Sequence, residues 1–598
     1  MERAVHKETF SSIEAPAVTR RSFLGKGAVA VAAMASVPAP GQVQAQTDRN
    51  ASDSSNAPHA SRRSSFLEVI RIPDEVTAYG SFEKTLPANR IPLERTGSQW
   101  TRGHVSVESR VGQDALVLTL AAPSTPISVV HLRWHTDVAP DVSALGDAWE
   151  RSYGDLGWRN LIPERVLPWY FATYDGTAYH GYGVQTGAGA LCFWQLDPQG
   201  VSLWLNVTNG GNGVELGDRR LTMATVRSRR GNAGEESTSA LRALCRSLCS
   251  RASRPAAAIY GANDWCYSYG RSTAQSILRD TEFIVGLSPK TAVRPFSVID
   301  GGWQDATPSW PDMRRLAHDI KQRTARPGIW IRPLEAPRDA APGLLLPSAR
   351  FGQNTGRARE LAYDPTNPEA RELIHTKLRE LANWGYEMVK HDFTTYDLLG
   401  QWGFEMGPQP TSPGWSLGDR SKTNAEVIGE LYTLIRESVG SAMLLDGCNT
   451  IGHLGQGIFD LQRTGDDTSG HQWERTRRMG VNTLAFRLPQ HGSFFVLDAD
   501  VVGLTEAVPW EFNRQWLDVL ARSGTATLVS AGPPAHGSEQ SAALRDAFAI
   551  ASEGGTGATP RDAMETSTPE LWQTGNSAAD ERRYHWSGAQ GACPFLSP

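Results

Sequence analysis

Residues 386–393 read Tyr-Glu-Met-Val-Lys-His-Asp-Phe, a short apolar segment that carries a lysine and an aspartate. It follows a helix-like stretch, 367–384, that ends at Gly385, and glycine is favoured just beyond a helix C-terminus. The segment is too short and too apolar for another helix, so it predicts a buried strand. Side chains alternate along a strand, which places Lys390 and Asp392 on the same face.

Two interpretations of this charged pair stay open from the segment alone. A lysine and an aspartate at the end of a buried strand are costly unless they are paired or used. The ammonium of Lys390 would hold Asp392 ionised at neutral pH, which suits a carboxylate nucleophile. A structural ion pair at a sheet edge explains the same two residues.

The region around this segment, residues 255–535, alternates short apolar runs with helical patterns. The eight predicted strands are 257–260, 296–300, 328–332, 388–392, 442–446, 461–465, 484–486 and 527–530. Predicted helices between them include 272–286, 313–323, 368–384 and 424–439. This alternation and length predict a (β/α)8 TIM barrel. A doubly wound sheet is the alternative, but no Gly-rich phosphate loop follows the first predicted strand.

Different patterns flank the predicted barrel on both sides. Residues 65–250 contain short apolar alternations broken by turn residues, as in 209–213 (Asn-Gly-Gly-Asn-Gly), and predict a β-sandwich domain. A single helical pattern, 236–249, leads from it into the barrel. Residues 536–598 hold one more helix, 542–551, and are too short for a full sandwich, so we expect a C-terminal extension or partial β cap.

The N-terminal residues 1–45 have the features of a twin-arginine signal peptide. Residues 19–26 read Thr-Arg-Arg-Ser-Phe-Leu-Gly-Lys, an Ala/Val-rich run follows at 27–37, and Val-Gln-Ala at 43–45 resembles a cleavage site. The apolar run is too short to span a bilayer. Residues 46–64 are polar and predict a disordered linker. We therefore expect a periplasmic or secreted protein that meets the twin-arginine translocase during export and no membrane after signal removal.

Composition excludes several other classes of protein. The 598 residues are 40% hydrophobic and 21% charged, which is ordinary for a globular chain of more than one domain. A net charge of −5 gives no reason to expect a nucleic acid partner. The six cysteines form no CxxC pair, and the histidines share no ligand spacing, so no metal, cofactor or disulfide framework is expected.

Polar side chains recur at the C-terminal ends of the predicted strands, which face the active site in a TIM barrel. The strand ends carry Asn263, Asp264 and Trp265; Asp300, Gly302 and Trp303; Trp330 and Arg332; Lys390 and Asp392; Asp446, Cys448 and Asn449; and Arg463, Asp466 and Asp467. One aspartate at a strand end is unremarkable because aspartate is common in turns. Carboxylates on several strands, interleaved with Trp, Lys and Arg and without a metal or phosphate motif, indicate glycoside hydrolysis.

Four of these segments resemble the α-galactosidases (melibiases) of glycoside hydrolase families 27 and 36. Residues 390–393 are similar to their Lys-x-Asp strand, 298–304 to their Ile-Asp-Asp-Gly-Trp-Gln strand end, 447–449 to a Cys-containing turn, and 459–468 to their Arg-x-x-x-Asp segment. The segments agree in order and spacing over about 255–533, and the preceding sandwich is similar to the family 36 arrangement. The resemblance implies a retaining α-galactosidase-like hydrolase acting on an oligosaccharide or glycoconjugate.

The resemblance also implies roles for individual residues. Asp392 would be the nucleophile that forms a covalent glycosyl-enzyme, and Asp467, four residues after Arg463, would be the acid/base. Asp466 competes for the second role, because some relatives read Trp-Thr-Ser-Asp-Asp here. Lys390 and Arg463 would bind sugar hydroxyls and keep the nucleophile charged.

The remaining implied residues form the sugar-binding pocket. Asp300 would accept hydrogen bonds from the C4 and C6 hydroxyls, with Trp265 and Trp303 lining the pocket. The other candidates are Asp264, Arg332, Asp446, Cys448 and Asn449.

Three departures from the family pattern weaken the assignment of the sugar but leave the reaction class. Gly301 replaces the second of the paired aspartates, Arg332 begins a segment in place of the familiar Glu-Pro, and Asn449 stands where a glutamate often binds the C2 hydroxyl.

Other functions and other roles for single residues remain as alternatives. The first functional alternative is another α-glycosidase or a transglycosylase, acting on raffinose-type donors, α-N-acetylgalactosaminides or β-L-arabinopyranosides. The second is a sugar-binding protein on a decayed barrel, which the intact carboxylates argue against. Arg463 could simply neutralise the acidic pair, Arg332 could be a salt-bridge residue and Cys448 a small buried filler. Asp498 and Asp500 either cap a helix near Trp510 or reach the rim of the site.

Overall fold

The computed structural model describes residues 66–593 apart from 255–256, 305–308, 311, 355, 358, 533–535 and 576. The predicted signal peptide and linker lie outside these residues. Among the described residues, none of the helices combines the length and apolar character needed to cross a membrane.

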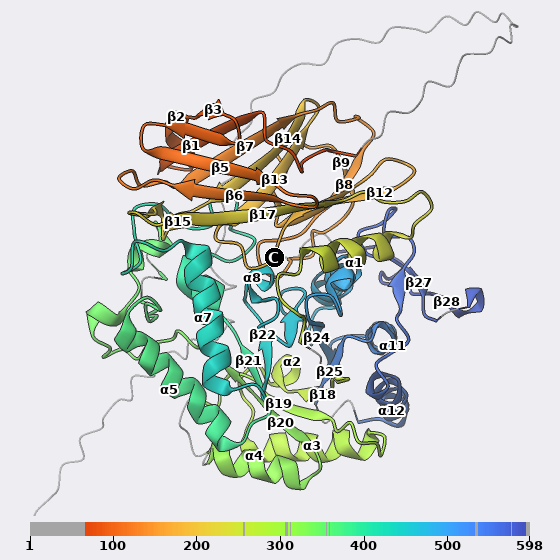
Figure 1. Cartoon of the computed structure of the whole chain (residues 1–598). Helices are drawn as coiled ribbons and strands as arrows, with labels where there is room; N and C mark the ends of the chain where they lie inside the picture. Colours follow the sequence, from red (N-terminus) through yellow and green to blue (C-terminus); the bar gives the residue numbers. More distant parts are fainter. Residues whose placement is uncertain are drawn as a thin grey trace, which may run out of the picture. The chain divides into compact units, whose positions relative to one another are not determined.

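Two antiparallel sheets form the first part of the structure (Figure 1). One contains β1 (Glu75–Glu83), β2 (Leu86–Pro92), β7 (Val129–His135), β10 (Leu167–Pro168), β13 (Leu191–Asp197) and β14 (Gly200–Asn206) in the order β10-β13-β14-β7-β1-β2. The other contains β3 (Glu94–Thr96), β4 (Gln99–Arg102), β5 (Val105–Val111), β6 (Leu116–Ala121), β8 (Ser143–Gly146), β9 (Arg159–Asn160), β11 (Tyr170–Tyr174), β12 (Tyr179–Val184) and β17 (Leu221–Arg229) in the order β3-β4-β5-β6-β17-β12-β11-β8-β9. Every second residue of β6 is buried, which is typical of a strand that faces a sandwich core. A small hairpin, β15 (Thr208–Asn209) and β16 (Asn212–Gly213), occupies the predicted turn region.

Eight parallel strands close into a barrel below the sandwich in Figure 1. They are β18 (Tyr260–Asn263), β19 (Phe296–Ile299), β20 (Arg326–Ile331), β21 (Met388–His391), β22 (Leu444–Gly447), β23 (Leu461–Arg463), β24 (Val496–Leu504) and β25 (Ala526–Ala531). The connecting helices are α2 (Trp265–Ser268), α3 (Ala274–Leu287), α4 (Met313–Gln322), α5 (Pro368–Trp384), α6 (Thr394–Leu399), α7 (Asn424–Val439), α8 (Gly452–Gly455), α9 (Trp473–Thr476), η4 (Arg477–Asn482), α10 (Thr483–Arg487), η5 (Leu488–Gln490) and α11 (Trp510–Ser523), with short 3-10 turns η2 (Pro342–Leu344) and η3 (Ser348–Phe351). The predicted fold class, a TIM barrel preceded by a β-sandwich, is confirmed.

Local sequence explains how the chain enters β21. The side chain of Asn367 accepts hydrogen bonds from the first backbone N–H groups of α5, and Pro368 occupies the first helical position. The helix ends at Gly385, whose φ of 90° is a left-handed conformation that costs glycine little. The four buried residues of β21 follow directly, as expected for a parallel strand that is covered on both faces.

The seventh predicted strand, 484–486, is wrong. These residues lie in α10, and the seventh strand is β24. A short apolar run does not distinguish a buried helical turn from a strand, and the two aspartates in β24 hide its apolar character. The first strand also lies three residues later than predicted, at β18.

The correction moves Asp498 and Asp500 from a helix end to the barrel. The helix near Trp510, α11, has Pro509 as its N-cap and no side-chain cap, so the capping interpretation of both aspartates is wrong. The register of β24 shifts between Asp498 and Val501, and Asp500 has a φ of 67°. This bulge keeps both carboxylates buried in the barrel.

Two further regions complete the structure. Helix α1 (Ser237–Leu248) connects the sandwich to the barrel. After the barrel, α12 (Ser538–Ser552) is followed by a three-stranded sheet of β26 (Thr559–Pro560), β27 (Leu571–Gln573) and β28 (Glu581–Arg583). Trp572 and Trp586 are buried with the residues of α11 and α12, so the C-terminal residues pack on the barrel helices.

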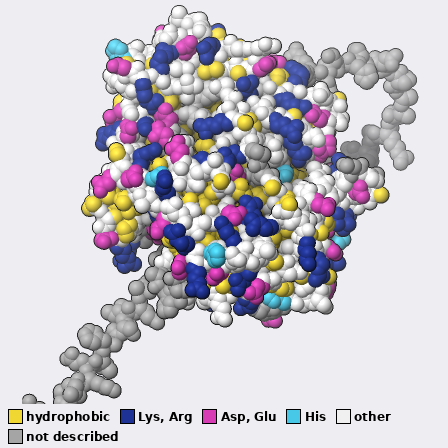
Figure 2. Space-filling view, turned by 60° about the horizontal axis from the view of Figure 1, so that its bottom comes forward, with side chains coloured by type: hydrophobic (Ala, Val, Ile, Leu, Met, Phe, Trp, Pro, Cys, Tyr) yellow, Lys and Arg dark blue, Asp and Glu magenta, His cyan; other side chains and the backbone are white. Residues whose placement is uncertain are grey.

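On the face that Figure 2 presents, Lys and Arg side chains are interspersed with Asp and Glu. This mixture agrees with a net charge close to zero.

Candidate active site

The candidate nucleophile, Asp392, directly follows β21 and is fully buried. Its Oδ1 accepts hydrogen bonds from the backbone N–H groups of Phe393 (2.7 Å) and Asn449 (3.1 Å). Its Oδ2 accepts one from the indole N–H of Trp330 (3.1 Å). Such donors favour the ionised carboxylate, the form that a nucleophile needs.

Phe393 adopts a left-handed backbone conformation with a φ of 66°, immediately after the nucleophile. A non-glycine residue in this region stores roughly 1–3 kcal/mol unless its surroundings impose it. The aromatic ring of Phe393 is buried and packs against Trp330, Tyr396 and Trp402. This packing holds the turn that brings its own N–H onto Asp392.

Lys390 forms an ion pair with Asp300, with 2.6 Å between Nζ and Oδ2. Burial opposes the charge of this lysine, but the surrounding carboxylates, Asp300 first, hold the pKa of Lys390 above its ordinary value. Asp300 also accepts a hydrogen bond from the amide of Asn263 (2.8 Å). The sequence suggested a pair of Lys390 with Asp392, and the structure pairs Lys390 with Asp300 from another strand.

Asp264 supports Asp300 from the neighbouring strand end. Its Oδ1 accepts a hydrogen bond from the backbone N–H of Asp300 (2.8 Å). Burial, and then the charge of Asp300, raise the pKa of Asp264 to about 6.

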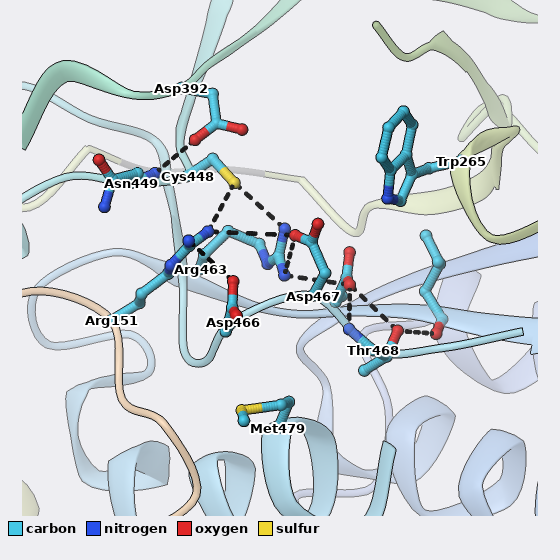
Figure 3. Close-up of polar contacts among 12 residues, drawn as sticks. Arg151, Trp265, Asp392, Cys448, Asn449, Arg463, Asp466, Asp467, Thr468 and Met479 are labelled. Carbon is cyan, nitrogen blue, oxygen red and sulfur yellow. Dashed lines mark hydrogen bonds and ion pairs between the residues drawn. The ribbon is translucent and has the colours of Figure 1, made fainter. Parts of the chain in front are cut away.

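Arg463, the last residue of β23, is fully buried among carboxylates. Its guanidinium lies 3.4 Å from Asp467 (Figure 3). It also lies 3.0 Å from Asp500 and 3.8 Å from Asp498. Burial opposes its charge, yet the carboxylates, Asp500 first, hold the pKa of Arg463 well above its ordinary value. The neutralising interpretation of Arg463 thus describes contacts that are present.

The two candidate acid/base residues differ sharply in their surroundings. Asp466 forms ion pairs with Arg151 (2.7 Å) and Arg475 (2.6 Å), one on each carboxylate oxygen. Burial alone would raise the pKa of Asp466, but these two arginines, Arg151 first, hold it below its ordinary value. Asp467 lies 3.4 Å from Arg463 and 4.0 Å from Arg151.

Asp446, on β22, lies deep in the barrel beside Asp498 and is fully buried. Burial raises the pKa of both carboxyl groups. The charge of Asp498 further raises the pKa of Asp446, and the charge of Asp500 further raises that of Asp498. Asp446 therefore belongs to the charged network under the site, together with Lys390 and Arg463.

Cys448 and Asn449, which follow β22, lie between the nucleophile candidate Asp392 and the arginines beside the acid/base candidates (Figure 3). The Sγ atom of Cys448 accepts hydrogen bonds from Arg463 (3.2 Å) and Arg151 (3.7 Å), so this cysteine is more than an apolar filler. Asn449 contacts Asp392 through its backbone and also accepts a hydrogen bond from the N–H of Tyr396 (2.9 Å).

The aromatic candidates and Arg332 have mainly packing and ion-pair contacts. Trp265 is 8% exposed and, in Figure 3, lies across the site from Asp392. The indole N–H of Trp303 donates to the carbonyl of Trp330 (2.8 Å). Arg332 pairs with Asp397 (2.5 Å) and Glu360 (3.0 Å), which supports its interpretation as a salt-bridge residue behind the nucleophile.

Sequence reasoning missed several residues of this site. Glu150 and Arg151 come from the sandwich, and nothing in a loop sequence far from the barrel marks them. Asp500 was named only as a residue that either caps a helix or reaches the rim of the site, because its strand was misplaced. Trp330 stood at a predicted strand end, but its hydrogen bond to Asp392 depends on tertiary structure.

Arginine and lysine side chains accompany these carboxylates. In the part of the chain that the structure describes, no group of three or more His, Cys, Asp and Glu is arranged to hold a metal ion.

No protein-family model matches the chain, and no curated protein matches its sequence. Solved structures do match it. The α-galactosidase TtGalA of Thermus thermophilus, in complex with p-nitrophenyl α-D-galactopyranoside, is 18% identical with a TM-score of 0.54, over 82% of this chain and 99% of that chain. The family 36 α-galactosidase AgaA of Geobacillus stearothermophilus, a variant in complex with 1-deoxygalactonojirimycin, is 12% identical with a TM-score of 0.51, over 84% of this chain and 76% of that chain. The fold of this chain is therefore that of the family 36 α-galactosidases.

Proposed function

We propose that this protein is an exported, retaining glycoside hydrolase that removes terminal α-linked galactose from oligosaccharides or glycoconjugates. The observation that carries the proposal is the arrangement of two carboxylates at the ends of barrel strands. Asp392 is held by N–H donors on both of its oxygens, and Asp467 follows β23 within reach of Arg463. A pair of carboxylates is what retaining glycosidases use.

The chemistry proceeds in two displacements. In the first, a carboxylate oxygen of Asp392 attacks the anomeric carbon while the carboxyl group of Asp467 donates its proton to the departing glycosidic oxygen. The bond to the leaving group breaks and a glycosyl ester forms on Asp392. In the second, the Asp467 carboxylate takes a proton from water, whose oxygen attacks the anomeric carbon and releases Asp392.

Ion pairing supports Asp467 over Asp466 as the acid/base. An acid catalyst must carry a proton before the first step. Asp466 lies 2.7 and 2.6 Å from two arginines that hold its pKa below its ordinary value and favour its ionised form, whereas the two arginines beside Asp467 lie farther away, at 3.4 and 4.0 Å. The role of Asp466 in this proposal is to hold Arg151 and Arg475 in place.

Two observations support an α-galactoside as substrate. The two matching structures described above are α-galactosidases, and the Thermus enzyme has been seen with stachyose and a variant of the Geobacillus enzyme with raffinose. The ion pair between Lys390 of β21 and Asp300, which follows β19, supplies a donor and an acceptor for sugar hydroxyls.

One observation favours a second candidate, another α-glycosidase or a transglycosylase. Gly301 stands where the family pattern has an aspartate, and a Cβ atom there would lie 3.5 Å from the ring of Trp330. Position 301 therefore places no carboxylate beside that ring. A sugar hydroxyl that such a carboxylate would bind loses this acceptor, so the site would favour a different arrangement of sugar hydroxyls.

The decisive experiment is hydrolysis of a panel of aryl glycosides by the protein from about Gln46 onward, compared with D392A and D467A. We expect turnover of the α-galactoside with retention at the anomeric carbon, read by NMR of the first product. D392A should abolish turnover, and D467A should be least impaired on the most activated leaving groups. Turnover of another glycoside alone would favour the second candidate. Inversion at the anomeric carbon would contradict the double displacement. No turnover of any glycoside by folded protein would favour a sugar-binding protein.

Export is a separate part of the proposal, based on residues 19–26. Fusion of residues 1–64 to a folded reporter, with Arg20 and Arg21 both replaced by lysine as the control, would test it by cell fractionation. Export of both fusions alike would contradict a twin-arginine route.

A further inference from the structure

One loop of the sandwich, residues 147–155 after β8, extends to the end of β23. The backbone N–H of Ser152 donates to the carbonyl of Thr464 (2.9 Å), and the N–H of Asp466 donates to the carbonyl of Ser152 (3.0 Å). These bonds form a parallel bridge between Ser152 and Gly465. The sandwich thus adds a short piece of strand beside the segment that carries both acid/base candidates.

Side chains that follow β23 hold this loop at its start. Arg487 pairs with Asp147 (2.8 Å), donates to the carbonyl of Glu150, and also donates to the carbonyl of Thr464 (3.1 Å). The amide of Gln490 donates to Asp147 as well (2.9 Å). One guanidinium therefore fixes the sandwich loop and the acid/base segment to each other.

Arg151 acts on the acid/base side of the site. It is 4% exposed, and its guanidinium lies 2.7 Å from Asp466 and 4.0 Å from Asp467. It also lies over the ring of Trp402, 5.4 Å from the centroid, and that ring packs on Phe393 beside the nucleophile.

Glu150 acts on the nucleophile side of the site. Its carboxylate is buried and accepts hydrogen bonds from the side chain of Asn449, from the hydroxyl of Tyr153 and from the backbone N–H of Gly403 (2.8 Å). Asn449 in turn donates its backbone N–H to Asp392. Glu150 therefore reaches the nucleophile through one intermediate residue.

We propose that Glu150 and Arg151, supplied by the sandwich, are positioning residues for both catalytic carboxylates of the barrel. Glu150 orients Asp392 through Asn449, and Arg151 orients Asp467 directly and through its ion pair with Asp466. The inference rests on the proposed glycosidase function. It implies that the sandwich completes the active site in addition to covering the barrel.

The test compares R151A and R151K with wild type on two galactosides, one with a highly activated aryl leaving group and one with an unactivated alkyl group. Misplacement of an acid catalyst by about 1 Å costs on the order of 10²-fold in rate. We expect R151A to lose roughly 10²-fold in kcat on the alkyl galactoside, clearly less on the activated one, and to change KM little. R151K should recover part of the loss, and guanidinium ions should partly rescue R151A, because a cation returns to the cavity.

R133A is the matched control for a general loss of packing. Arg133 is a partly buried sandwich arginine, with a side chain that is 13% exposed, and it forms two hydrogen bonds with Asp197, at 2.6 and 2.7 Å, within its own sheet. Its removal should lower stability without changing the dependence of kcat on the leaving group. E150Q tests the role of Glu150. We expect it to lower kcat on both galactosides by a similar factor, because the nucleophile attacks both.

The outcomes separate the inference from the proposed function. If wild type is active and R151A keeps the wild-type ratio of kcat on the activated galactoside to kcat on the alkyl galactoside, as R133A should, then the role of Arg151 is overturned and the proposed function stands. A wild type without turnover of any glycoside would overturn the proposed function, and this inference with it. If R151A fails to fold, R151K and its leaving-group ratio decide the question.

Discussion

Replacing Asp466 by asparagine removes a negative charge that two arginines share while changing the side-chain volume very little. The wild-type carboxylate lies 2.7 Å from Arg151 and 2.6 Å from Arg475 and is 13% exposed. Breaking one side of a buried ion pair costs about 3–5 kcal/mol, because the partner's charge stays buried. Arg475 keeps its hydrogen bond to the backbone carbonyl of Asp467 (2.8 Å), so we expect about 3 kcal/mol, the lower end of that range.

The assay is urea-induced unfolding of wild type and D466N, followed at several pH values. The pKa of Asp466 is lowered in the folded protein, so its stabilisation is fully present above its ordinary value of 3.8 and is lost as the pH falls through the lower folded value. The difference between the two proteins should therefore be largest near neutral pH and shrink below about pH 4. A difference that is independent of pH would contradict the ion-pair explanation.

Catalysis by D466N tests the assignment of the acid. We expect D466N to keep more activity on the unactivated galactoside than D467N does, because Asp467 still supplies the proton although Arg151 loses its ion pair with residue 466. D467N should instead lose most on the unactivated substrate. The opposite pattern, with leaving-group dependence in D466N and not in D467N, would refute the reasoning and make Asp466 the acid/base.

Two further predictions concern the nucleophile and a buried histidine. W330F removes the indole donor to Asp392 Oδ2, a hydrogen bond to a charged group worth about 1.5–3 kcal/mol, so kcat/KM should fall by roughly 10- to 100-fold, and an unchanged value would contradict a role for this bond. His453 is buried, stacks on Trp169 and hydrogen-bonds the carbonyl of Val184 (2.8 Å), and burial lowers its pKa from 6.5 to about 4. The unfolded chain therefore binds this proton first as the pH falls, so the free energy of unfolding should fall by up to about 3 kcal/mol between pH 6.5 and pH 4, and a slope in H453Q as steep as that of wild type would contradict this.

Strand β21 was predictable because the local sequence signals agree there. A capped helix, a left-handed glycine at Gly385 and an apolar run of strand length all point to β21. The seventh strand was not predictable by the same reasoning. The buried residues of β24 include Asp498 and Asp500, which interrupt the apolar pattern of this strand in the sequence. Their burial is possible because both pair with Arg463, and these pairs are visible only in the structure.

The same contrast applies to the candidate site. Asp392, Asp467, Lys390 and Arg463 were named from the sequence, since strand ends in a barrel converge on one face. Their partners were not, because an ion pair depends on distance in space. Lys390 pairs with Asp300, 90 positions away, and this pairing cannot be read from the spacing of Lys390 and Asp392.

By itself, the sequence determined the alternation of strands and helices, the change from sandwich to barrel, and the carboxylates at the barrel strand ends. These properties depend on hydrophobic period and turn chemistry, which are local along the chain. Only the tertiary structure decided that the Glu150–Arg151 pair of the sandwich contacts the barrel site and that Asp466 is bound by two arginines. Glu150 and Asn449 are 299 positions apart, and Arg151 also reaches Asp466 from the sandwich, whereas Arg475 is only nine positions from Asp466; all of these contacts are selected by burial and charge pairing after the elements have formed.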